Sequence, residues 1–82
     1  MTWADSKPKL ETAFKKAGWS VIHNQKIDVL VVTTKQGDIY FFGKDNNPDN
    51  PSGFTFNSLL NSTPRYALDS IEVLIAYIIK NN

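Results

Sequence analysis

The chain has 82 residues and a mass of 9.3 kDa, which predicts a single domain over residues 1–82, since domains usually take about 100 to 200 residues. Apolar residues make up 41% and charged residues 21%, so the composition is globular and excludes a disordered chain. Nine lysines and arginines against eight aspartates and glutamates give a net charge of +1, far from the strongly basic balance of a dedicated nucleic-acid-binding protein.

The chain contains no cysteine and one histidine. The absence of cysteine excludes disulfides, thiolate nucleophiles and cysteine-ligated zinc, and one histidine cannot build a conventional multi-histidine metal site. No apolar run has the length of a signal peptide core or of a transmembrane helix. We therefore expect a cytoplasmic, soluble protein with no cofactor, no metal, no membrane partner and no small-molecule substrate.

The first periodic segment predicts an amphipathic helix over residues 7–17. Asp5 or Ser6 is the expected N-cap, Pro8 lies in the first turn, and Gly18 ends the helix by taking the left-handed conformation. The apolar positions, spaced i, i+3, i+4, i+7, are Leu10, Ala13, Phe14 and Ala17.

Three strands are predicted after Gly18, because the apolar period changes there from helical spacing to alternation. The first strand begins at Trp19, the second is the β-branched run 27–34, and the third is 38–43. Short turns at 24–26 and 35–37 make these strands an antiparallel sheet. Both faces of the second hairpin are apolar, and Tyr40 and Phe42 are expected on a face that the helices leave open.

Residues 44–53 are dominated by turn formers and predict a loop. Asp45, Asn47 and Asp49 have the alternate spacing of calcium ligands, but Asn50 stands where a calcium loop needs glycine and Phe56 where it needs glutamate. The alternative to ion binding is that these side chains bind neighbouring backbone groups. Residues 54–56 are either a short fourth strand or a loop that drops two phenylalanine rings onto the core.

The last segment predicts a helix over residues 64–80, with Ser62 or Thr63 as N-cap and Pro64 in its first turn. Three side chains of this helix fall together on one flank, beyond what one sheet face would cover. They are Tyr66, Val73 and Tyr77. The element order predicts an α+β, two-layer sandwich of α-β-β-β-α order, with a three-stranded antiparallel sheet and both helices on one face. The apolar side of the last helix is Ala67, Leu68, Ile71, Leu74, Ile75 and Ile78.

His23 is the only candidate general base in the chain. It alternates with Trp19 and Val21, a pattern typical of a half-buried strand histidine. Nucleophilic catalysis would also require a nearby hydroxyl and a third group that orients the imidazole, and the local sequence supplies neither. We expect no catalytic residue and no enzyme activity.

Asp28 and Lys44 occupy places loosely comparable to the aspartate and lysine of a restriction-nuclease-like core. That core holds Mg²⁺ and water with two carboxylates and a lysine. Phe42 stands at the second acidic position here, so this hypothesis is an inactive nuclease-like domain in which Asp28 and Lys44 are adjacent in space without metal.

The order helix, three strands, helix also resembles, over most of the chain, the topology of the double-stranded-RNA-binding domain. Such a resemblance implies phosphate contacts from a lysine cluster at the start of the second helix, where this chain has Ser62-Thr63-Pro64-Arg65. The corresponding alternative function is a nucleic-acid-binding module whose affinity falls steeply with salt. Its binding residues would be Lys7, Lys9, Lys15, Lys16 and Arg65.

The favoured hypothesis is a small binding domain whose partner is another protein or a second copy of the chain. Aromatic residues make up 12% of the chain, and exposed tyrosines favour protein contact. Size suggests an inhibitor, immunity or accessory protein of phage or mobile-element type. The expected contact is apolar and weakly dependent on salt, and its residues are Tyr40, Phe42, Tyr66, Val73 and Tyr77.

Overall fold

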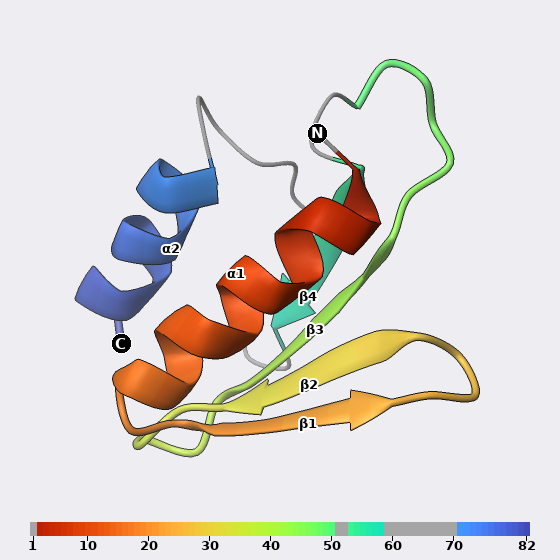
Figure 1. The fold of residues 1–82 in the computed structure, drawn as a ribbon. Helices are drawn as coiled ribbons and strands as arrows, with labels where there is room; N and C mark the ends of the chain where they lie inside the picture. Colours follow the sequence, from red (N-terminus) through yellow and green to blue (C-terminus); the bar gives the residue numbers. More distant parts are fainter. Residues whose placement is uncertain (1, 51–52, 59–70) are drawn as a thin grey trace.

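The computed structural model describes residues 2–50, 53–58 and 71–82, and it has an α+β fold with a four-stranded antiparallel sheet. The strand order is β1-β2-β3-β4, so each strand pairs with its neighbour in sequence (Figure 1). No helix in the described ranges has the length and apolar character needed to cross a membrane. The elements are α1 (Trp3–Lys16), β1 (Ser20–Asn24), β2 (Val29–Thr33), β3 (Ile39–Lys44), β4 (Phe54–Ser58) and α2 (Ile71–Lys80).

The three-stranded sheet expected from the sequence is wrong, because residues 54–58 form a fourth strand. β4 pairs with β3, with Phe56 opposite Phe42 and Tyr40 opposite Ser58. Phe54 and Phe56 are both buried, so their alternation places two rings on the core side of the sheet. Two buried rings on one side of a short strand supply enough apolar surface to fix its register.

Helix α1 begins earlier than the predicted residue 7, because Thr2 caps it. The Thr2 hydroxyl oxygen accepts a hydrogen bond from the Asp5 backbone N–H at 3.2 Å, and the Asp5 carboxylate accepts one from the Thr2 N–H at 3.3 Å. This capping box satisfies two free backbone donors, and Pro8 then lies inside the helix. The predicted end is confirmed, since Gly18 has a φ of 85° just after the helix.

The β1–β2 turn is longer than predicted and removes Ile27 and Asp28 from the second strand. Residues 25–28 form the turn, and Asp28 has a φ of 52°, the one left-handed non-glycine residue in the described ranges. Aspartate tolerates this conformation better than a β-branched residue. The turn therefore places the Asp28 carboxylate beside the end of β1.

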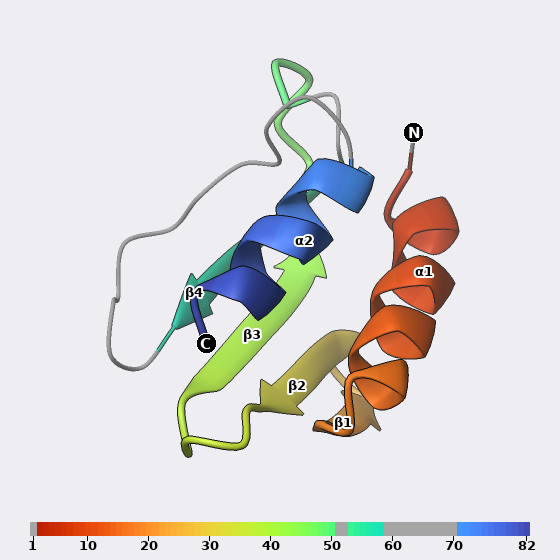
Figure 2. The same ribbon diagram turned by 90° about the vertical axis from the view of Figure 1, so that its left-hand side faces the viewer.

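One core cluster contains buried residues of both helices and of the sheet. Phe42 lies at its centre, with ring centroids of Phe14, Phe54 and Phe56 between 5.5 and 6.2 Å away. Helix α1 also contacts α2, and the two lie next to each other (Figure 2). The remaining buried apolar members of the cluster are Trp3, Leu10, Trp19, Leu30, Val32, Ile71, Leu74 and Ile78.

The buried side of α2 agrees with its predicted apolar side at Ile71, Leu74 and Ile78, which are at most 2% exposed. The predicted first part of this helix, including its caps, Ala67 and Leu68, lies outside the described residues.

The strand side chains that alternate with the core residues define the opposite side of the sheet, which we call the outer face. Its residues are Ser20, Ile22, Asn24, Val29, Val31, Thr33, Ile39, Phe41, Gly43, Thr55 and Asn57.

Candidate protein-binding surface

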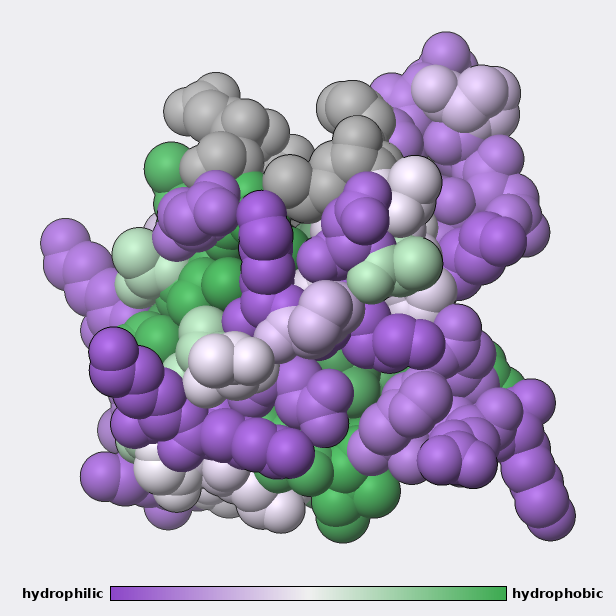
Figure 3. All heavy atoms as spheres, viewed as in Figure 1, coloured by the Kyte–Doolittle hydropathy of each residue, from purple (hydrophilic) through white to green (hydrophobic). Residues whose placement is uncertain are grey.

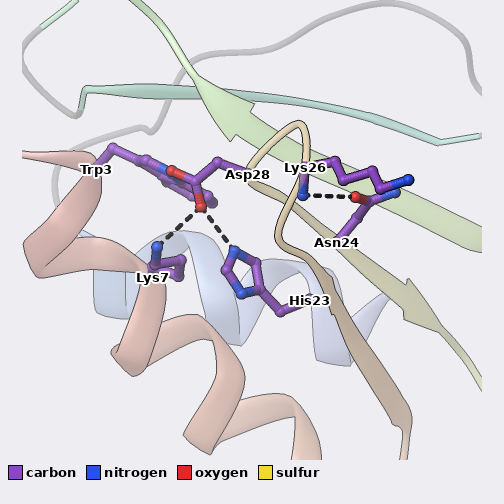
Figure 4. Close-up of polar contacts among 6 residues, drawn as sticks. All are labelled: Trp3, Lys7, His23, Asn24, Lys26 and Asp28. Atoms are coloured by element: carbon purple, nitrogen blue, oxygen red, sulfur yellow. Dashed lines mark hydrogen bonds and ion pairs between the residues drawn. The ribbon is translucent and has the colours of Figure 1, made fainter.

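Three donors converge on the Asp28 carboxylate where α1 meets the β1–β2 turn (Figure 4). Lys7 Nζ lies 2.9 Å from Oδ1, His23 Nε2 lies 2.7 Å from the same oxygen, and Trp3 Nε1 donates to Oδ2 at 2.8 Å. The hydrogen bonds from Lys7, His23 and Trp3 hold the pKa of the Asp28 carboxyl far below its ordinary value. These contacts connect the N-terminal part of α1 to the β1–β2 hairpin, so their role is structural. We call the four residues Trp3, Lys7, His23 and Asp28 the clamp.

The clamp gives the first testable prediction, made on the variant Asp28→Asn. Because the pKa of Asp28 is lower in the folded chain than in the unfolded chain, its stabilisation is complete above the unfolded value of about 3.9 and is lost as the pH falls below it. Asparagine accepts the left-handed backbone, so the variant chiefly removes charge. We expect Asp28→Asn to lower the urea midpoint at pH 7 and to lower it somewhat less at pH 3, because the stabilisation is lost progressively as the pH falls from the unfolded pKa toward the much lower folded pKa.

Asp49→Asn is the matched control, because Asp49 is exposed in the loop after β3. It should leave the midpoint unchanged at both pH values. An equal loss of stability at pH 7 and pH 3 in Asp28→Asn would show that the carboxylate charge does not stabilise the clamp.

The nuclease-like hypothesis predicted that Asp28 lies next to Lys44. The described structure instead pairs the Asp28 carboxylate with Lys7 and His23, and the backbone of Lys44 pairs with Phe54. In the described ranges no group of three histidine, cysteine, aspartate or glutamate side chains could hold a metal ion. Because Val29 pairs with Gly43, Asp28 and Lys44 each lie one residue beyond a paired position, and the adjacency of their side chains stays a prediction.

In the loop after β3, the oxygen ligands considered for calcium bind local groups. Asp45 Oδ1 accepts from the Asn47 N–H at 3.0 Å, and Asn47 Oδ1 accepts from the Asp49 N–H at 3.0 Å. Asn50 Nδ2 donates to Asp45 Oδ2 at 2.8 Å and to the Phe54 carbonyl at 2.9 Å. The hydrogen bond from Asn50 also lowers the pKa of Asp45. The interpretation of this loop as locally bonded turns is confirmed.

Most of the lysines proposed for phosphate binding have acidic neighbours. Lys7 pairs with Asp28, Lys9 Nζ lies 3.6 Å from Glu72, and Lys15 Nζ lies 3.2 Å from Glu11. Lys16 is exposed. Arg65 lies outside the described residues. Pairing reduces the positive potential that α1 offers to a phosphate backbone.

The expected exposure of Tyr40 and Phe42 on an open sheet face is wrong. Phe42 is 0% exposed at the centre of the core, and Tyr40 is partly buried against it. Both faces of β3 are apolar, so alternation alone could not tell which face the helices cover. The residues on the outer face of β3 are Ile39 and Phe41, and Phe41 is 37% exposed.

Helix α2 leaves apolar side chains exposed on the side away from α1 as well as on the side toward it. Val73 and Tyr77, spaced i, i+4, are 44% and 49% exposed, so the predicted exposure of this flank is confirmed at these two positions. Tyr66 lies outside the described residues. Ile79, on the other flank, is 37% exposed.

A groove of about 700 Å³ lies between α1 and α2. Its lining includes two small residues, Ala13 from α1 and Ala76 from α2. Lys9 and Glu72 border it with their ion pair. In Figure 3, hydrophobic atoms gather over α2 beside the hydrophilic side chains of α1. The other lining residues are Pro8, Thr12, Ile75 and Ile79.

Sequence reasoning missed this groove, which we call the helix groove. The α2 lining at Glu72, Ile75, Ala76 and Ile79 has the spacing i, i+3, i+4, i+7, and this signal was present in the sequence. The periodicity assigned Ile75 to the apolar side of the helix, because it cannot show how closely two helices approach each other. The groove depends on that distance.

Searches for related proteins add no family or function. No protein-family model, no curated protein and no solved structure matches the chain.

Proposed function

We propose that the chain is a non-enzymatic binding domain that recognises another protein through the helix groove. The single observation that carries the proposal is the surface of α2. Its ten residues include only two charges, Glu72 and Lys80, and apolar side chains extend beyond its buried side to the exposed Val73, Tyr77 and Ile79, which is more apolar surface than a helix needs to face one core. In the free chain only the side with Ile71, Leu74 and Ile78 is buried.

The proposal takes both helices to lie on one face of the sheet. It is supported by the core cluster, which contains Leu10 and Phe14 from α1, Leu74 from α2, and Leu30 and Phe42 from the sheet. With this arrangement the helix groove opens away from the sheet. A partner helix with an apolar side can then pack along it as a third helix, with its ridge of side chains between α1 and α2.

Charge and polarity favour a protein partner over a nucleic acid. The groove walls are apolar or small at Ala13, Ile75, Ala76 and Ile79, and the charges at its border already neutralise each other as Lys9 and Glu72. An inhibitor, immunity or accessory protein would use such a surface to bind one target stoichiometrically. We expect the complex to persist at about 1 M salt, where the screening length falls to about 3 Å.

The variant Ala76→Arg tests the proposal, because it fills the groove from an exposed position of α2 with a good helix former. Affinity capture from cells of the source organism, quantified by mass spectrometry, should recover a partner with the wild-type chain. Ala76→Arg should recover at least about tenfold less of it, since a charged side chain blocks the apolar site.

Two control variants make the result specific. Gln25→Arg adds the same charge in the exposed β1–β2 turn and should recover the partner fully. Tyr77→Ala removes a ring from the other flank of α2 and distinguishes the two flanks. Equal recovery with Ala76→Arg and wild type, or loss with Tyr77→Ala alone, would exclude the helix groove as the binding site.

A further inference from the structure

The outer face of the sheet carries exposed apolar side chains among uncharged polar residues. The strand register places Ile22, Val31, Phe41 and Asn57 in one row across all four strands. Ile22 is 62% exposed and Phe41 is 37% exposed. Depletion of charged residues is a feature of the centres of protein interfaces.

No residue of the outer face is charged, although the chain has nine basic and eight acidic residues. In a two-fold symmetric contact each surface faces a copy of itself, so charged residues tend to meet like charges. A surface that carries no charge avoids this repulsion. Its apolar side chains include four β-branched residues, Ile22, Val29, Val31 and Ile39, which pack well on a pleated surface. The same absence of charge gives no electrostatic preference for a foreign partner.

The size of the outer face suits a weak dimer. Four strands spaced about 4.8 Å apart, with five residues of about 3.3 Å each, cover roughly 320 Å² in projection. A contact between two faces of this size belongs to the small, weak class of interfaces, below about 1,200 Å² in total.

Gly43 adds a shape argument to the charge argument. It belongs to the outer face beside Phe41, and a side chain there would meet only Val29 Cγ2 at 3.6 Å. The absence of a side chain leaves a shallow gap next to an exposed ring. A projecting ring and a gap on the same strand suit two copies related by a two-fold axis.

We propose that two copies of the chain associate face to face through their outer faces, as two sheets packed about 10 Å apart. The dimer leaves the helix groove of each copy accessible. It is therefore independent of the protein partner proposed above, and each proposal can fail without the other.

The mass of the chain in solution, measured by light scattering after size-exclusion chromatography, tests this proposal. Loaded at up to about 1 mM, which populates even weak complexes, the wild-type chain should have twice its 9.3 kDa mass. The dimer should persist at high salt, because no charge of the outer face takes part. A monomer at every concentration would overturn the proposal.

Charge variants locate the contact. Phe41→Lys should weaken self-association by about a hundredfold or more, because two lysines would be buried opposite each other. Circular dichroism checks its fold, and Ile22→Lys at the exposed edge repeats the test where the fold is least affected. Mixing Phe41→Lys with Phe41→Glu should restore the dimer, since the opposite charges then meet.

Two further variants serve as controls. Gln25→Lys adds a charge outside the outer face and should remain dimeric, and Ala76→Arg should also remain dimeric because the helix groove is not part of the contact. A dimer that survives both Phe41→Lys and Ile22→Lys would place self-association on another surface.

Discussion

Phe42→Ala is expected to remove more than half of the stability of the folded protein. The side chain is fully buried, and its ring lies within about 6 Å of the rings of Phe14, Phe54 and Phe56. Removing a buried phenylalanine ring costs about 3 to 5 kcal/mol, because transfer energy is lost and a cavity remains. A domain of this size has a total stability of only about 4 to 8 kcal/mol. The free energy of unfolding in urea, followed by circular dichroism, measures the loss.

Phe41→Ala is the matched control, because it removes the same ring from the next residue of the same strand. Phe41 belongs to the outer face and is 37% exposed, so the loss in the isolated chain should stay near 1 kcal/mol or below. The comparison is made at low protein concentration, where self-association does not add to stability. Equal losses in the two variants would contradict the assignment of the two sheet faces.

Leu74→Ala is expected to cost about 2 to 4 kcal/mol of stability. Leu74 is 1% exposed on the side of α2 that meets the core, and its removal leaves a cavity between that helix and the sheet. Tyr77→Ala, three residues later on an exposed flank, should cost less than about 1 kcal/mol. Urea unfolding of both variants beside the wild type gives the two values.

The pair tests how α2 is rotated about its axis. If Tyr77→Ala destabilised the chain as much as Leu74→Ala, the side of α2 that carries Val73 and Tyr77 would belong to the core and would not be an exposed apolar surface. Only the groove side of α2 would then remain exposed for a partner to cover.

The helices and strands were largely predictable, because each has its own period in the sequence. The spacing of Leu10 and Phe14 is helical, and the β-branched run 29–33 is a strand in both the prediction and the structure. The start of α1 was not predicted, because Pro8 was interpreted as a first-turn residue. The capping box of Thr2 and Asp5 was a second signal of the same kind, and it determines where the helix begins.

The facing of β3 could not be derived from its sequence. Ile39, Tyr40, Phe41 and Phe42 are apolar or aromatic in succession, so either alternate pair can be buried. Pairing decides the outcome: Phe42 lies between Leu30 and Phe56 in the register, and that row belongs to the core. Register depends on contacts between strands that local patterns do not contain.

The sequence predicted the exposed side of α2 but not the helix groove. Val73 and Tyr77 were correctly expected on an exposed flank, because helical spacing determines which residues share a side. The helix groove depends on two elements far apart in sequence, since α1 and α2 both contribute to its lining. The spacing of apolar residues within one helix does not determine the distance between two helices.

The two proposals taken together predict a bivalent assembly. Self-association through the outer face presents two helix grooves in one particle. A target with two or more binding segments would then be held with a higher effective affinity than by one chain. Phe41→Lys, if monomeric and folded, should keep its affinity for a single partner segment and lose this enhancement.

Photo-cross-linking from Ile79 tests the central claim, that α2 and the helix groove bind another protein, most directly. A photoreactive phenylalanine analogue at this exposed groove position is compared in cells with the same analogue at Gln25. The proposal predicts one main adduct from position 79 and none from position 25, with the adduct lost when Ala76→Arg is added. Identical adducts from both positions, or no adduct from position 79, would contradict it.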